Sequence, residues 1–167
     1  CPDTDMMALV NLQSLPDRGV LIGLDPGARR LGLAVCDSLR LIATPLAILK
    51  RGRRLAPSLA ALFALIDERG AVGLVCGLPI NMDGSEGPRS QAARALVHNI
   101  LEYRDIPIAF QDERLSSAEA ERVMIDADLS RARRAESLDS SSAAIILQTA
   151  LDRLVNISKR DASQSTS

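Results

Sequence analysis

The sequence predicts an α/β fold, a five-stranded mixed sheet flanked by helices. Three short apolar runs come first, joined by turn residues, which indicates consecutive antiparallel strands. Apolar strands and helical segments then alternate, an order typical of parallel strands with helices packed against the sheet. The 167 residues fit one domain, expected at 19–156, between a loosely ordered extension (1–18) and a disordered, serine-rich tail (157–167).

The elements are justified in chain order. Strands are expected at 20–24 and 31–36, on either side of a Pro-Gly turn, and a third at 41–49. Helical spacing of apolar residues predicts a helix at 56–70, with Ser58 as its cap and Gly70 as its end. A strand at 71–76, a helix at 89–103, a strand at 106–111 and helices at 117–126 and 137–155 complete the prediction.

Composition restricts the function. The 20 Lys and Arg nearly balance the 21 Asp and Glu, so the chain lacks the overall basic charge of many nucleic-acid-binding proteins. Aromatic residues make up only 2%, which weakens any proposal of base stacking. Three cysteines without CxxC spacing and no apolar run of ~20 residues predict a soluble, cytoplasmic protein that does not bind membranes. The one histidine, His98, is interpreted as a packing residue rather than a base.

Positive charge is concentrated near the predicted turn and after the third strand. No acid occurs at 38–66, where several of these cations lie. The clusters could hold phosphates or could form solvated faces that aid solubility, and the sequence leaves both open. Their members are Arg29, Arg30, Lys50, Arg51, Arg53 and Arg54.

Carboxylates follow two of the predicted strands. Asp25 ends the first strand, and Asp112 and Glu113 end the last one. Because neighbouring strand residues face opposite sides, only one of Asp112 and Glu113 can share the face of Asp25, and spacing does not decide which. Asp139 lies four residues before Ala143, at the edge of the last helix's apolar stripe. The alternative for Asp139 is an ordinary acid in a helix first turn.

Converging carboxylates repel one another unless a cation lies between them. Their oxygens suit Mg²⁺ or Mn²⁺, which can activate water for attack on a phosphodiester without a histidine. The loop "GLPINMDGSEGP", which includes Asn81 and Gly84, could offer backbone N–H groups to a phosphate, or could be an ordinary surface connection.

Four stretches resemble one family, the YqgF (RuvX) proteins, described as Holliday-junction resolvases and pre-16S rRNA nucleases. They are "IGLDPGARRLGLAVCD", "VCGLPINMDGSEGPRSQ", "QDERLSSAEAE" and "LDSSSAAIILQTALD", in the family's order. The resemblance implies a ribonuclease-H-like fold. It implies catalytic, metal-binding acids at Asp25, Glu113 (or Asp112) and Asp139, and phosphate contacts from Arg30 and Arg114. Ala28 departs from the family's Thr or Ser, and Ser141 and Ser142 replace apolar residues.

The resemblance implies a metal-dependent endonuclease that processes the 5′ end of pre-16S rRNA. Alternatives are a resolvase of four-way DNA junctions and a non-catalytic, RNA-binding ribosome assembly factor. A nucleotide-binding phosphotransferase is disfavoured, because such proteins need two domains of this kind. The sequence leaves open whether the protein is a monomer or a homodimer, and whether one metal ion or two are bound.

Overall fold

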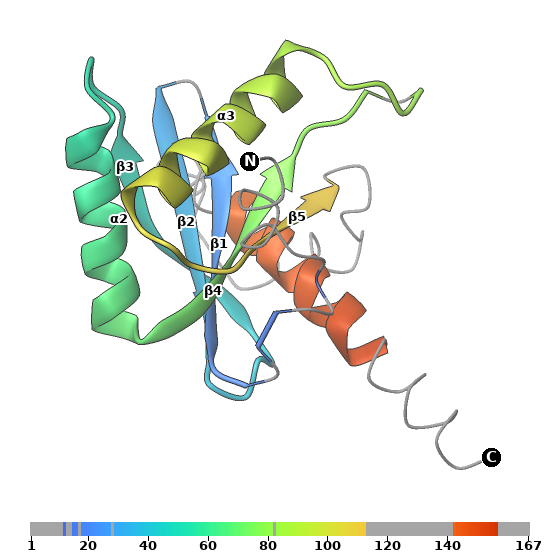
Figure 1. Cartoon of the computed structure of the whole chain (residues 1–167). Helices are drawn as coiled ribbons and strands as arrows, with labels where there is room; N and C mark the ends of the chain where they lie inside the picture. The colour runs from blue at the N-terminus through green and yellow to red at the C-terminus, as the bar shows by residue number, and fades with distance from the viewer. Residues whose placement is uncertain are drawn as a thin grey trace, which may run out of the picture.

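The computed structural model describes residues 12, 15, 16, 18–27, 29–81, 83–112 and 142–156. Within these ranges the chain forms a sheet and three helices (Figure 1). The third helix, residues 142–156, is called the C-terminal helix. The other elements are β1 (Val20–Pro26), β2 (Arg30–Cys36), β3 (Ala43–Lys50), α2 (Ala56–Arg69), β4 (Ala71–Leu78), α3 (Pro88–Tyr103) and β5 (Ile108–Asp112).

The sheet is mixed, as the order of elements predicts. Its strands lie in the order β3-β2-β1-β4-β5. The neighbours β1 and β2, and β2 and β3, are antiparallel, whereas β4 runs parallel to both β1 and β5. The predicted hairpins and the later strand–helix alternation are therefore confirmed. β1 lies at the centre of the sheet, and its carboxyl end faces the same edge as the carboxyl ends of β4 and β5.

Helices cover the sheet on both faces (Figure 1). On one face, α2 and α3 pack with Ile22, Leu24 and Leu74 in one buried cluster. On the other face, the C-terminal helix packs with Leu21 and Val75 in a second cluster. Adjacent residues of β1 thus serve opposite faces, as strand alternation requires.

The C-terminal helix approaches β1 closely at Gly23. A Cβ added to Gly23 would lie 2.7 Å from Leu147 Cβ and 2.8 Å from the Ala143 carbonyl oxygen. No side chain fits at those distances without movement of the backbone. Glycine therefore sets the spacing between strand and helix two residues before Asp25.

Two local predictions are wrong. Ser58 does not cap α2, because the helix already begins at Ala56, with Pro57 in its first turn. The Ser58 side chain is buried instead, and its hydroxyl donates to the Lys50 carbonyl oxygen at 3.1 Å. His98 is not a packing residue, since its side chain is 52% exposed and lies 3.2 Å from Glu102. Gly70 does end α2, in the left-handed conformation (φ 65°).

Candidate active site

Asp25 lies near the carboxyl end of β1 and is half-buried. Its backbone pairs with Gly32 of β2, and the preceding Leu24 pairs with Cys76 of β4. Leu24 belongs to the cluster under α2 and α3, and Gly23 faces the C-terminal helix. By alternation, Asp25 projects from the face that the C-terminal helix covers. The central strand thus holds this carboxylate between paired neighbours on both sides.

The turn after Asp25 is held from two directions. The Gly27 N–H donates to the Asp25 carbonyl oxygen at 3.1 Å. A Cβ on Gly27 would lie 2.4 Å from the Arg30 carbonyl oxygen, so the turn requires glycine. Arg51, which follows β3, donates its guanidinium to the Gly27 carbonyl oxygen and its backbone N–H to the Arg29 carbonyl oxygen, both at 2.8 Å. Arg51 therefore holds the turn in place and is half-buried.

Asp112 ends β5 and is half-buried, but it faces away from Asp25. Its neighbours show the alternation: Phe110 packs with the cluster under α2 and α3, and Gln111 contacts the C-terminal helix. Asp112 therefore shares the face of Phe110, whereas Asp25 projects from the other face. The other predicted ligands, Glu113 and Asp139, lie outside the described residues, as does the predicted phosphate contact Arg114.

A buried amide joins the end of β5 to the C-terminal helix. Gln111 is 1% exposed. Its Oε1 accepts a hydrogen bond from Arg153 at 2.9 Å, and its Nε2 donates to the Asp112 carbonyl oxygen at 3.1 Å. Sequence reasoning missed this pair. The signal was a polar residue at an inward position of an otherwise apolar strand.

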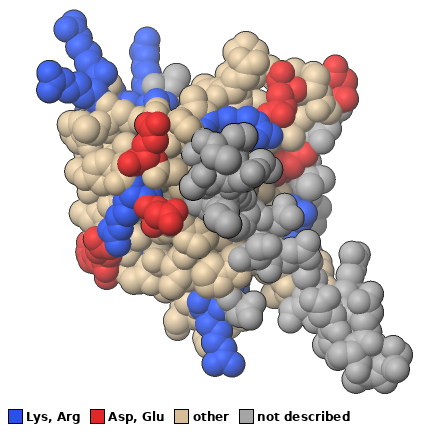
Figure 2. Space-filling model, in the orientation of Figure 1, with Lys and Arg blue, Asp and Glu red and all other residues tan. Residues whose placement is uncertain are grey.

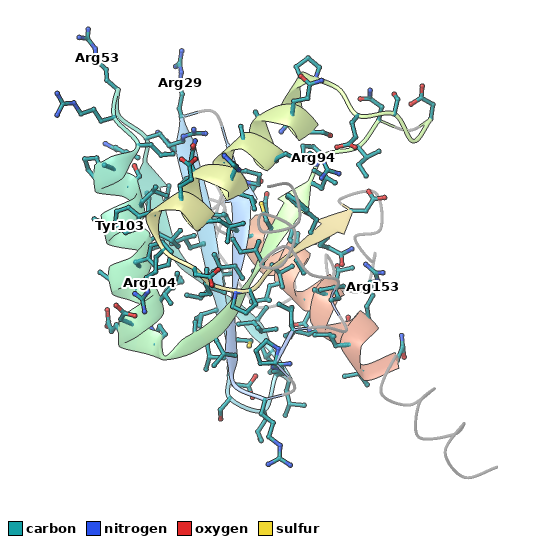
Figure 3. The ribbon with its side chains drawn as sticks, viewed as in Figure 1. Arg29, Arg53, Arg94, Tyr103, Arg104 and Arg153 are labelled. Carbon is teal, nitrogen blue, oxygen red and sulfur yellow. The ribbon has the colours of Figure 1, made fainter. Side chains whose placement is uncertain are left out.

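Five of the predicted phosphate-binding side chains are exposed at the edge of the sheet that holds Asp25. Arg30 pairs with Lys50 across β2 and β3, which brings the turn and the end of β3 together. Figure 3 shows Arg29 and Arg53 projecting beyond this edge. We call these exposed side chains the cationic edge: Arg29, Arg30, Lys50, Arg53 and Arg54.

The loop between β4 and α3 is shaped by its own hydrogen bonds. The Asn81 N–H donates to the Ser85 carbonyl oxygen at 2.9 Å, and the Gly84 N–H donates to the Asn81 carbonyl oxygen at 2.8 Å. Gly84 adopts a φ of 91°, which favours glycine. The backbone amides expected to bind phosphate thus already have acceptors within the loop. The Asn81 side chain is exposed and donates to the Ser85 hydroxyl at 3.1 Å.

An ion pair closes the same loop onto α3. Arg94 donates to Glu86 at 2.6 and 3.2 Å. This hydrogen bond lowers the pKa of Glu86 below its ordinary value. The loop therefore carries the negative charge of Asp83, while the charge of Glu86 is balanced by Arg94.

The described residues contain no cluster of three His, Cys, Asp or Glu that could hold a metal ion. Asp25 alone supplies a carboxylate on its face of the described sheet edge, and carboxylate oxygen suits Mg²⁺ or Mn²⁺. The donor chemistry of Asp25 fits such an ion, and the other predicted ligands, Glu113 and Asp139, lie outside the described residues. No helix in the described ranges is long and apolar enough to cross a membrane.

Comparisons with known proteins show the family to which the chain belongs. A family model described as "RuvX: Holliday junction resolvase" matches residues 19–153. The chain is 49% identical over 159 residues to a Rhodobacter capsulatus protein named "Putative pre-16S rRNA nuclease", covering 95% of this chain and 97% of that one. A Cereibacter sphaeroides protein of the same name is 52% identical over 143 residues, 86% of this chain and 89% of that one.

The fold is also found among solved structures. Thermus thermophilus RuvC in complex with a Holliday junction substrate is similar with a TM-score of 0.53 and 18% identity. The match covers 81% of this chain and 96% of that one. At this identity the similarity shows the fold, which confirms the predicted ribonuclease-H-like sheet.

Proposed function

Because the chain belongs to the RuvX family, we propose that it is a metal-dependent nuclease that processes the 5′ end of the 16S rRNA precursor. The observation that carries the proposal is the position of Asp25. A half-buried carboxylate ends the central strand, in a turn held by Arg51, beside five exposed cations. The relatives' names supply the RNA substrate. Free thiols at Cys36 and Cys76 support a reducing compartment, so we place the protein in the cytoplasm.

We assign the catalytic carboxylates to Asp25, Glu113 and Asp139. Strand alternation supports Glu113 over Asp112, since Asp112 shares the face of Phe110. When bound, Mg²⁺ or Mn²⁺ would lower the pKa of a bound water and stabilise negative charge on the phosphate. Asp25, Glu113 and Asp139 would hold the ion, and a carboxylate oxygen that does not bind the ion can accept the proton of the attacking water. The bond from the water oxygen to phosphorus forms as the bond to the leaving oxygen breaks, and the leaving oxygen takes up a proton.

The cationic edge holds the substrate backbone next to Asp25. Arg29, Lys50, Arg53 and Arg54 form no ion pair with any other described residue, so their charge is available to phosphates. Arg51 has a different role in this proposal. Its guanidinium already donates to the turn after Asp25, so it positions the carboxylate rather than the substrate.

The proposal is tested by a cleavage assay with Mg²⁺ or Mn²⁺, on a precursor rRNA fragment and a four-way DNA junction in parallel. Asp25→Asn removes the proposed ligand, and Asp105→Asn is the matched control, because Asp105 is exposed in the connection between α3 and β5. We expect RNA cleavage by the parent and the control, and none by Asp25→Asn.

The family description and the RuvC-like fold favour a second candidate, a junction resolvase. Cleavage of the DNA junction alone would replace the first proposal with this one. Binding of the RNA fragment without cleavage of either substrate would refute both and favour an assembly factor.

A further inference from the structure

Charge is distributed unequally on the two sides of Asp25. On the β2–β3 side lie four cations that form no ion pair with any other described residue, Arg29, Lys50, Arg53 and Arg54, and the sequence has no acid between Asp37 and Asp67. On the β4–β5 side lie Asp83 and Asp112, and the charges of Glu86 and Arg94 cancel. Arg89 is the one exposed cation of that loop and helix start without an ion pair among the described residues.

The figures show the same separation. Basic side chains gather at the upper left of Figure 2, where Figure 3 labels Arg29 and Arg53. Acidic side chains lie at the upper right, where Figure 1 places the loop that precedes α3. Among the described residues, a polyanion that reaches Asp25 therefore meets more cations without an ion pair on the β2–β3 side than on the β4–β5 side.

Aromatic residues are absent from this surface. The chain has one Tyr, two Phe and no Trp. Phe63 stacks on Tyr103 with ring centroids 5.3 Å apart, and Arg94 lies over Phe110, 5.1 Å from the ring centroid. The cationic edge therefore has no aromatic ring on which a base could stack. Proteins that bind single strands usually provide such rings, so this surface favours a base-paired segment.

We infer that the base-paired arm of the substrate lies over the cationic edge, on the β2–β3 side of Asp25, and that the unpaired strand leaves over the loop between β4 and α3. The inference rests on the proposed nuclease function and adds a direction to it. Bound in this way, the scissile phosphate is the one that meets Asp25 at the junction of paired and unpaired segments.

The direction is tested by tethered cleavage. Arg53→Cys and Arg89→Cys each replace an exposed arginine, one on each side of Asp25. Both variants also carry Cys1→Ser, and Cys36 and Cys76 are buried, so the introduced cysteine is the thiol that reacts. An iron chelate attached to this cysteine generates hydroxyl radicals that cut nearby RNA. The probe is an RNA hairpin with a single-stranded extension. We expect cuts in the stem from position 53 and in the extension from position 89. The reverse pattern, or equal cutting of both segments from each position, would overturn the inference.

Binding gives a second readout. Asp25→Asn protein keeps the RNA intact, so affinity is measured independently of cleavage. Adding Arg53→Ala and Arg54→Ala should weaken hairpin binding by about tenfold and make the salt dependence shallower by about two units of slope. Arg89→Ala should leave affinity for the paired stem unchanged. Equal weakening by both sets, or no weakening by the Arg53 and Arg54 pair, would sink the inference.

The two failures are distinguishable. If the tethered cuts follow the expected pattern but the parent protein cleaves nothing, the proposed function fails and the binding direction stands. If Asp25-dependent cleavage is observed but the cuts show no direction, the nuclease stands and the inference fails.

Discussion

The close approach of Gly23 to the C-terminal helix makes a quantitative prediction. Gly23→Ala adds one methyl group to β1. That methyl carbon would lie 2.7 Å from Leu147 Cβ and 2.8 Å from the Ala143 carbonyl oxygen, well inside van der Waals contact. The second contact is with backbone and cannot be relieved by a rotamer change. The helix must move away from the strand.

The expected cost follows from overpacking in other cores, about 1–3 kcal/mol. Alanine also restricts the unfolded chain relative to glycine, which offsets part of this cost by about 0.4–1 kcal/mol. Gly52→Ala is the matched control, because a Cβ there meets nothing within 4 Å and Gly52 is exposed. The difference between the two variants therefore isolates the packing cost.

Urea unfolding measures this difference. With equal slopes, a lower midpoint for Gly23→Ala than for Gly52→Ala reports stability alone. A difference of about 2 kcal/mol corresponds to roughly 4–8 °C in Tm for a chain of this size. Cleavage should also fall, because Asp139, one of the proposed catalytic carboxylates, lies three residues before the helix that must move. Equal stability and equal cleavage of the two variants would refute the packing argument.

Three further predictions follow from the site and the loops. Arg51→Lys should lower kcat several-fold with little change in RNA affinity, because lysine cannot reproduce the guanidinium contact with the turn. Arg53→Lys should leave both kcat and RNA affinity near the parent values. Steady-state kinetics with both variants decide whether Arg51 positions the turn or binds phosphate. The N–H groups of Ile42 and Leu41 lower the pKa of Asp37, so its contribution to stability is present above the ordinary value of 3.8 and is lost as the pH falls through the lower folded value. Urea midpoints from pH 5 to pH 3 should therefore fall less steeply for Asp37→Ala than for the parent. Removal of divalent ions with EDTA should abolish cleavage, and Mg²⁺ or Mn²⁺ should restore it in the parent but not in Asp25→Asn; cleavage that persists in EDTA would exclude the proposed metal dependence.

The sequence predicted the order of the described strands and helices along the chain because its signals are local. Apolar runs, the Pro-Gly turn and Gly70 each specify backbone geometry within a few residues. The predictions for Ser58 and His98 failed for a different reason. Both depend on the rotation of a helix relative to the core, and a shift of one or two positions turns a cap into a buried donor or a packing residue into an exposed one.

The candidate site shows the same limit. Asp25 could be predicted because it interrupts an apolar strand at its end. The choice between Asp112 and Glu113 could not, since it depends on which face Phe110 covers. The roles of Arg51 and Gln111 also depend on partners distant in the sequence. From the sequence alone, an exposed arginine such as Arg53 cannot be distinguished from one such as Arg51, whose guanidinium is hydrogen-bonded to the backbone of a turn.

The contact between Gly23 and the C-terminal helix has a consequence for the order of synthesis. β1 is translated well before the C-terminal helix, which packs against the face of β1 that carries Asp25. A nascent chain that ends before residue 142 contains the described sheet and the layer of α2 and α3, but it lacks the helix that packs on the Asp25 face together with Leu12 and Leu15. If the proposed activity is correct, the nuclease can mature only after residues 142–156 have been translated and have packed against β1.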